Sequence, residues 1–311
     1  MKRAGVLMLA AVPVALAATA YGISPSTHDD PRPAPPAAST QDEPRPSRPA
    51  TASTHDDPRP AHPSPSPSPS AATQDRAPED LAAPALKNLA QELVASAENS
   101  TLDWRSAYGY VQDIGDGQGY TAGLIGFCTG THDLLVLVER YTAAHPGNGL
   151  ARYLPALREV DGTDSHEGLD PGFPAAWRAE AKVPAFRAAQ EAERDRIYFD
   201  PAVSTAKRDG LGPLGQFIYY DAIVFHGPGT DGFYGIRERA MARARTPAEG
   251  GSEKAYLSAF LDVRRAAMRA KRPGIDTTRI DTAQRKFLEE GNLELRTPLV
   301  WQVYGETYKV P

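Results

Sequence analysis

The stretch AENSTLDWRSAYGYVQDIGDGQGYTAG, residues 97–123, places two carboxylates on unlike local structures. Glu98 ends an amphipathic helical pattern, whereas Asp116 lies among closely spaced glycines. Those glycines predict a sharply bent loop, because glycine adopts backbone conformations that other residues avoid. A protonated carboxyl leaving a packed helix, opposite an ionised carboxylate on a polar loop, is the arrangement that hydrolysis of a glycosidic bond needs.

This stretch has three other interpretations: a pair of surface carboxylates, a dinucleotide site and a calcium loop. A Glu and an Asp eighteen positions apart are more often two exposed surface groups. A dinucleotide site is disfavoured, because no apolar strand precedes Gly115 and the glycine spacing differs from the fingerprint. A calcium loop is disfavoured as well, because the third oxygen ligand and the closing Glu are missing. The residues alone therefore indicate a candidate carboxylate pair and no more.

The segment before Glu98 carries a regular apolar face. Its members recur at helical spacing and are Leu86, Leu89, Ala90, Leu93, Val94 and Ala97. We expect Glu98 to end close to the core, where partial burial raises the pKa of a carboxyl and suits a proton donor. Residues 110–114 and 120–127 are predicted as strands on either side of the glycine turn.

Downstream patterns predict a mainly helical domain. Helices are expected at residues 133–143, 149–160, 183–207, 214–225, 236–244, 253–271 and 282–290, with a loop at 161–173 and a β-like end at 300–310. The Asp200-Pro201 step should bend or break the long helix. Residues 214–225 are apolar nearly all round, which predicts a buried helix, and Asp221 inside it needs a partner because an unpaired buried charge is costly.

The N-terminal part has the composition of a targeting and spacer segment. Residues 1–20 read as a secretory signal, with a charged start, an apolar run and small residues before a cleavage site. The alternative, a membrane anchor, is disfavoured because the run is short for a hydrocarbon core about 30 Å thick. Residues 21–79 are rich in Pro and Ser, repeat STHDDPRPA at 26–34 and 53–61, and predict a disordered linker. That linker is either a spacer or a remnant of duplication. Residues 80–311 form the expected folded domain.

Charge and the rare side chains exclude several classes of function. The net charge of −5 argues against a nucleic-acid surface and permits a polycationic substrate. Cys128 is the single cysteine, so no intramolecular disulfide exists, and its apolar flanks favour a buried, inert thiol over a nucleophile. The histidines show no metal-binding spacing, so we expect no metal and no cofactor. The sequon at Asn99 adjoins Glu98, and we expect it to be unused.

Several long motifs in order resemble the bacterial chitosanases of glycoside hydrolase family 46. They include residues 96–141, YLPALREVDGTDSHEGLDPGF at 153–173, residues 193–229, FLDVRRAAM at 260–268, DTTRIDTAQRKFLEEGNLEL at 276–295 and WQVYGETY at 301–308. The resemblance covers about residue 80 to the C-terminus. It implies a mainly α (α+β), lysozyme-like fold, in which two helical lobes and a small β-hairpin region flank a substrate cleft and a long bent helix joins the lobes.

The same resemblance implies an activity and its catalytic residues. The expected activity is secreted, extracellular endo-hydrolysis of β-1,4 bonds in chitosan by single displacement with inversion. Glu98 matches the general acid in the AEN motif, and Asp116 matches the general base in GDG. Thr121, in GYT, matches the residue that positions the attacking water; by itself it reads as an ordinary strand hydroxyl. We expect chitosan as the partner and a monomeric enzyme, with neither nucleic acid nor stable membrane association.

Four further residues carry over from the family. Asp133 matches a carboxylate that binds substrate amino groups, whereas its plain alternative is a helix N-terminal charge. Asp221, Arg264 and Arg279 match a buried ionic network behind the acid, and the alternative is a purely structural ion pair.

Three positions depart from the family pattern. Gln118 stands where relatives commonly have Arg, and Lys271 and Ile275 stand where they have acidic residues, which leaves subsite affinity and substrate preference open. Two other functions also remain open: a muramidase-like enzyme acting on peptidoglycan, and a non-catalytic cell-wall binding protein. Substrate charge separates the first from a chitosanase, and the presence of both Glu98 and Asp116 argues against the second.

Overall fold

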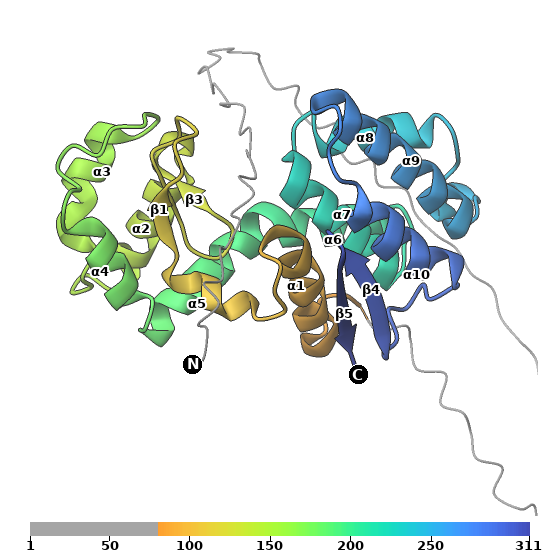
Figure 1. Cartoon of the computed structure of the whole chain (residues 1–311), viewed down its shortest axis with the longest axis horizontal. Coiled ribbons are helices and arrows are strands. Elements are labelled where there is room, and N and C mark those ends of the chain that lie inside the picture. The colour runs from red at the N-terminus through yellow and green to blue at the C-terminus, as the bar shows by residue number, and fades with distance from the viewer. Residues whose placement is uncertain (1–79) are drawn as a thin grey trace, which may run out of the picture. The chain divides into compact units, whose positions relative to one another are not determined.

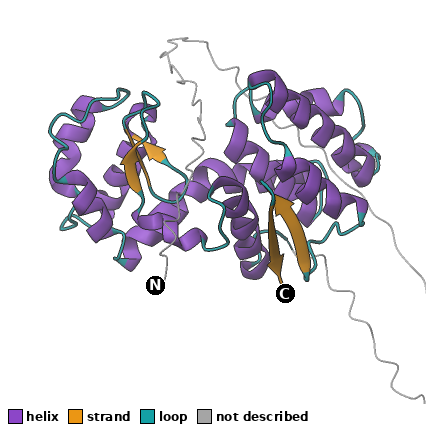
Figure 2. Cartoon of the chain, in the orientation of Figure 1, coloured by secondary structure: helices purple, strands orange, loops and turns teal. Residues whose placement is uncertain are grey.

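The computed structural model describes residues 80–311, which fold mainly into helices with two small sheets (Figures 1 and 2). The signal and linker predicted at residues 1–20 and 21–79 lie outside the described residues. No helix within residues 80–311 is both long enough and apolar enough to cross a membrane. The buried apolar side chains form two separate clusters, so the folded part has two lobes, each with its own core.

The first lobe, here called the hairpin lobe, is built around a core whose buried residues run from Ala95, near the end of the first helix, to Phe186. Its antiparallel sheet has the order β1-β2-β3, and Gln112 pairs with Thr121 and Asp113 with Tyr120. The strands are β1 (Val111–Asp113), β2 (Tyr120–Ala122) and β3 (Phe127–Cys128). The helices are η1 (Trp104–Gly109), η2 (Thr129–Thr131), α2 (Asp133–Ala144), η3 (Ala151–Tyr153), α3 (Leu154–Val160) and α4 (Phe173–Glu180).

The second lobe, here called the helical lobe, combines the first helix with the C-terminal half of the described chain (Figure 1). Its helices are α1 (Pro84–Glu98), α7 (Pro213–His226), α8 (Phe233–Met241), η5 (Pro247–Glu249), α9 (Glu253–Lys271), η6 (Arg279–Gln284) and α10 (Arg285–Glu289). Strands β4 (Leu299–Val303) and β5 (Glu306–Val310) form its antiparallel hairpin. The expected buried helix is confirmed, because every residue of α7 from Pro213 to Val224 is buried.

The long helix expected between the lobes is confirmed, and directly before the Asp200-Pro201 step, where a bend or break is predicted, it changes to a π-helical segment. It consists of α5 (Pro184–Arg194), η4 (Asp195–Phe199), which is a π-helix, and α6 (Asp200–Arg208). Proline lacks an N–H and clashes with the carbonyl four residues earlier. The π segment directly before Pro201 accommodates this, because the N–H of Asp200 bonds to the carbonyl of Asp195 instead.

The predicted elements are mostly confirmed, with differences at their ends. The helix at 253–271 has the expected bounds, and the expected β-like end is the β4–β5 hairpin. The helix expected at 236–244 begins three residues earlier, at Phe233, and the one expected at 282–290 begins as the π-helix η6 at Arg279. Helix α4 was not predicted, since its Pro and Gly neighbours look like a continuation of the loop.

Candidate active site

Glu98 is the last residue of α1, on the helical lobe. The apolar face of α1 is buried as its spacing predicts, and this directs the end of the helix toward the core. The Glu98 side chain is 16% exposed, and its Oε1 lies 2.7 Å from Nη2 of Arg279. The alignment of this contact falls short of a hydrogen bond, so the two groups interact mainly through charge. Glu98 is therefore held between the protein interior and solvent.

Behind Glu98 lies a fully buried ionic network centred on Asp221. Nη2 of Arg279 lies 2.6 Å from Asp221 Oδ1, and Nη1 of Arg264 donates to Asp221 Oδ2 at 2.7 Å. Gln284 Nε2 donates to the same Oδ2 at 2.6 Å. Burial acts to raise the pKa of Asp221, but the Arg279 and Arg264 guanidinium groups outweigh it and hold this pKa below its usual range. Asp221 is therefore ionised, and the sequence-predicted residues Asp221, Arg264 and Arg279 are in contact.

The network includes partners that sequence reasoning missed. Gln284 was not singled out, because it lies five positions after Arg279 and so on a different face of a regular α-helix; the π-helix η6 brings the two side chains together. Trp301, on β4, donates from Nε1 to Ser96 Oγ at 3.0 Å, two residues before Glu98. His226, the last residue of α7, is partly buried, and its burial and the charge of Arg264 and Arg279 lower its pKa to about 2, so this histidine is neutral.

Asp116 lies on the loop between β1 and β2, on the hairpin lobe. The glycines around it adopt positive φ angles, 72° at Gly115 and 81° at Gly117, which other residues rarely adopt. Asp116 Oδ1 accepts a hydrogen bond from the N–H of Gln118 at 3.0 Å. The side chain is partly exposed. Asp116 is thus carried on a glycine loop that is independent of α1.

Thr121 and Cys128 face each other across strands β2 and β3. Thr121 Oγ1 lies 3.3 Å from Cys128 Sγ, and the thiol also donates to the Gly126 carbonyl at 3.2 Å. Burial raises the pKa of Cys128 to about 11, which keeps the thiol neutral. The structure agrees with the expectation of a buried, inert cysteine.

Asp133 begins α2 and lies close to the joining helix. Its Oδ1 accepts hydrogen bonds from Cys128 N at 2.8 Å and from Thr131 Oγ1 at 2.7 Å. Burial nevertheless raises the pKa of Asp133 to about 6. Burial, and after it the charge of Asp133, raise the pKa of Tyr198, a partly buried tyrosine of η4. The sequence had given no signal for Tyr198.

The three departures from the family pattern fall in different places. Gln118 is partly buried in the glycine loop. Lys271 is the exposed last residue of α9, and Ile275 is partly buried against the core of the helical lobe. Asn99, of the sequon, is exposed directly after Glu98.

Each lobe thus supplies one carboxylate of the pair predicted from the sequence. The helical lobe supplies Glu98 at a helix end, and the hairpin lobe supplies Asp116 on a bent loop. A mainly helical, two-lobed fold with a small sheet on each lobe is that of a lysozyme-like glycoside hydrolase. Comparison with known proteins narrows this class to one family.

The sequence profile described as glycosyl hydrolase family 46 matches residues 92–299. The chitosanase of Streptomyces sp. (strain N174) is 57% identical over 242 residues, which cover 77% of this chain and 87% of that protein. The chitosanase of Nocardioides sp. (strain N106) is 53% identical over 247 residues, covering 79% and 88%. A chitosanase solved as a co-crystal with substrate has a TM-score of 0.70 at 55% identity and covers 75% of this chain and 99% of that one. The chain belongs to glycosyl hydrolase family 46 and is a glycoside hydrolase.

Proposed function

We propose that this enzyme is a secreted endo-chitosanase that hydrolyses β-1,4 glycosidic bonds in chitosan by single displacement with inversion. Its relatives in the family carry the name chitosanase, and one was solved with substrate. One observation supports this mechanism above all: Glu98 and Asp116 lie on different lobes. Glu98 is at a helix end, paired with Arg279, and Asp116 is on the glycine loop. Carboxylates on separate elements leave room for a water between base and sugar.

In this mechanism Glu98 protonates the leaving oxygen as the glycosidic bond breaks. Arg279 holds its side chain in place, and Asp221, which neutralises Arg279 from behind, keeps the guanidinium fixed. Asp116 takes a proton from the attacking water on the opposite face of the sugar. Thr121, on the strand that follows the glycine loop, is proposed to give that water a second hydrogen-bond partner.

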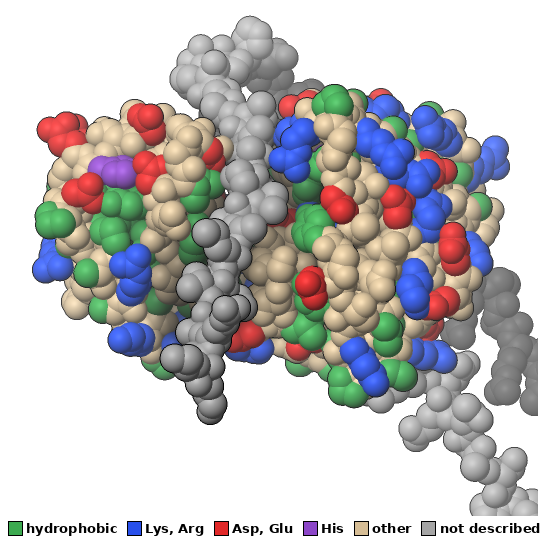
Figure 3. Space-filling model, in the orientation of Figure 1, with side chains coloured by type: hydrophobic (Ala, Val, Ile, Leu, Met, Phe, Trp, Pro, Cys, Tyr) green, Lys and Arg blue, Asp and Glu red, His purple; other side chains and the backbone are tan. Residues whose placement is uncertain are grey.

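Asp133 is the proposed contact for a substrate ammonium group. Its Oδ1 accepts hydrogen bonds from Cys128 N and Thr131 Oγ1, which hold the carboxylate in place at the start of α2. Chitosan is polycationic where it is deacetylated, so a partly buried carboxylate on the hairpin lobe supports this substrate over peptidoglycan. Figure 3 shows several acidic side chains on the visible face of this lobe.

The boundaries and the location of the protein are part of the same proposal. Residues 1–20 are the signal peptide, residues 21–79 the linker, and residues 80–311 the catalytic domain, which works as a monomer outside the cell. Packing that begins at Leu81, a fully buried residue, supports the start of the domain near residue 80.

Product analysis on defined substrates tests the proposal. The purified enzyme is expected to release short glucosamine oligomers from the interior of highly deacetylated chitosan and nothing from peptidoglycan. Glu98→Gln is the inactive control, and Glu92→Gln, on the same helix and bonded to Asn88 Nδ2, is the matched active control. Release of muropeptides from peptidoglycan would favour the muramidase alternative, and binding to both polymers without cleavage would favour the non-catalytic one.

A further inference from the structure

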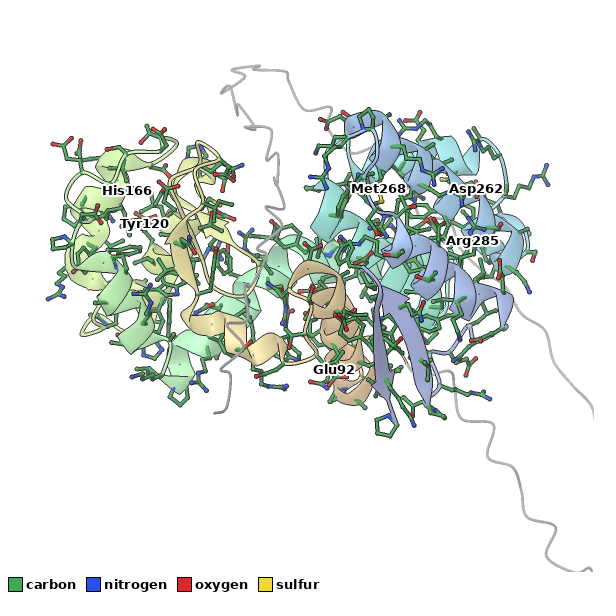
Figure 4. All side chains as sticks on the ribbon, in the orientation of Figure 1. Glu92, Tyr120, His166, Asp262, Met268 and Arg285 are labelled. Carbon is green, nitrogen blue, oxygen red and sulfur yellow. The ribbon has the colours of Figure 1, made fainter. Side chains whose placement is uncertain are left out.

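A cluster of four side chains lies beside the glycine loop, outside the residues discussed above. Asp113 and Tyr120 come from β1 and β2, and His166 and Asp170 come from the loop 161–172 between α3 and α4. His166 Nε2 lies 3.2 Å from Asp113 Oδ2, and His166 Nδ1 lies 3.5 Å from Asp170 Oδ2. The imidazole stacks on the Tyr120 ring with centroids 4.1 Å apart and an interplanar angle of 11° (Figure 4).

The cluster closes the base of the loop that carries Asp116. Asp113 and Tyr120 are paired across the strands on either side of that loop. Asp113 Oδ1 accepts a hydrogen bond from Gly115 N at 2.7 Å, while its Oδ2 faces His166. Tyr120 is buried and donates its hydroxyl proton to Asp170 Oδ1. Asp113 therefore links the imidazole directly to the backbone next to Asp116.

The loop 161–172 also supports the far end of the glycine loop. Gly162 N donates to the Thr129 carbonyl at 3.0 Å. A Cβ placed on Gly119 would lie 2.2 Å from Thr129 Oγ1 and 3.3 Å from the Asp164 Cα, so this end of the loop packs without space for a side chain. The loop 161–172 thus contacts the glycine loop at both ends, while Asp116 at its centre is partly exposed.

We propose that His166 is a positioning residue for Asp116, the base assigned in the proposed function on which this inference rests. The imidazole lies between two carboxylates, with one ring nitrogen near each. Nε2 is close to Asp113 Oδ2 but poorly aligned for a hydrogen bond, so this is a polar contact at close range. Asp113 is bonded to the backbone N–H of Gly115, so fixing Asp113 also fixes Gly115. The position of Gly115 in turn sets the direction in which the Asp116 carboxylate points toward the attacking water. A displacement of about 1 Å at a reacting group costs on the order of 100-fold in rate.

A double-mutant cycle tests this role in the full chain. His166→Phe keeps a ring for stacking on Tyr120 but removes both nitrogens, and His166→Gln keeps polar contact without the ring. With a chitosan hexamer as substrate, we expect His166→Phe to lower kcat about 10- to 100-fold with KM within about 2-fold. In an Asp116→Asn background, His166→Phe should lower kcat less than about 2-fold, because His166 acts through the Asp116 carboxylate, which is already absent. His166→Gln should recover part of the loss.

His145→Phe, at an exposed histidine of the same lobe, is the matched control and should leave kcat unchanged in both backgrounds. An equal loss from His166→Phe in both backgrounds, an unchanged kcat, or a change confined to KM would overturn the proposal. Should His166→Phe not fold, Asp170→Asn, which withdraws one of the two carboxylates, is carried through the same cycle with the same criteria. Absence of chitosan cleavage by the wild-type enzyme would overturn the proposed function instead, so the two failures are distinguishable.

Discussion

Arg279 contacts Glu98 and Asp221 through a single nitrogen, Nη2, at 2.7 Å and 2.6 Å. One guanidinium group therefore bridges a partly exposed carboxylate and a fully buried one. Burial acts to lower the pKa of Arg279, but Asp221 and Glu98 outweigh it and raise this pKa above its ordinary value, so the bridge is permanently cationic. The position of Glu98 thus depends on a carboxylate that substrate does not reach.

Removing the buried carboxylate should destabilise the fold. Asp221→Asn leaves the buried Arg264 without a counter-ion and leaves Arg279 with Glu98 alone, which should cost about 3–5 kcal/mol of unfolding free energy. Glu290→Gln, which breaks only the exposed Lys286–Glu290 pair, is the control and should leave Tm nearly unchanged. Because the folded pKa of Asp221 is lowered, its stabilisation is present above the unfolded value of about 3.9 and is lost as pH falls further. Equal Tm values for the two variants at neutral pH would contradict this account.

The two proposed catalytic carboxylates should respond differently to amide substitution. Glu98→Gln should lower kcat on the order of 100- to 10,000-fold, because the amide cannot donate the required proton, while oligosaccharide binding persists. Asp116→Asn should be damaging but less so, since Thr121 still orients water. Steady-state kinetics with calorimetric binding checks both, with Asp164→Asn, at an exposed residue of the same lobe, as control. A fully active Glu98→Gln enzyme would remove Glu98 from the mechanism.

Stereochemistry decides between the two displacement mechanisms. With Asp116 as a base acting through water, cleavage of the β linkages should first release α-anomeric reducing ends. Proton NMR of the earliest products, before mutarotation, measures this. Initial β-anomer would show that Asp116 attacks the sugar directly, as retaining enzymes do.

Substrate affinity should follow the ionisation of Asp133. Burial raises the pKa of this carboxyl to about 6, so it loses its charge as pH falls from about 7 to about 5. If the carboxylate binds an ammonium group, KM should rise up to about tenfold over that range. Asp133→Asn should have a high KM that no longer changes there. A wild-type KM profile that is unaffected by this substitution would argue that Asp133 serves only to hold Cys128 and Thr131.

Removing residues 1–79 should leave activity on soluble chitosan unchanged. Residues 80–81 already belong to the folded part, since the Asp80 side chain pairs with Lys207 and the backbone N–H of Leu81 donates to Gln216 Oε1 at 3.0 Å. The preceding Pro- and Ser-rich segment offers little apolar surface to a core. Comparison of kcat for the full chain and the shortened one checks this, and a large loss would show that the linker takes part in catalysis.

Local sequence determined the elements on which the site is built. The apolar spacing of residues 86–97 was sufficient to predict a helix that ends at Glu98, and the glycines around Asp116 were sufficient to predict a bent loop between strands. An apolar run at 214–225 containing Asp221 required a buried partner. These inferences hold because helical periodicity and glycine conformation act over a few neighbouring residues.

Tertiary structure decided which of these elements meet. Helix α1 packs in the helical lobe although the chain continues from it into the hairpin lobe, and Trp301 bonds to Ser96 across 205 positions. Arg279 reaches Asp221 from 58 positions away, and nothing in the period of either helix identifies the other as its partner. Residues 161–172 show no periodicity, yet they bring His166 against Asp113. Periodicity indicates which face of a segment is buried, but not which other segment covers it. That choice follows from packing among segments that are distant in the sequence. The surroundings of Glu98 and Asp116 could therefore be known only from the tertiary structure.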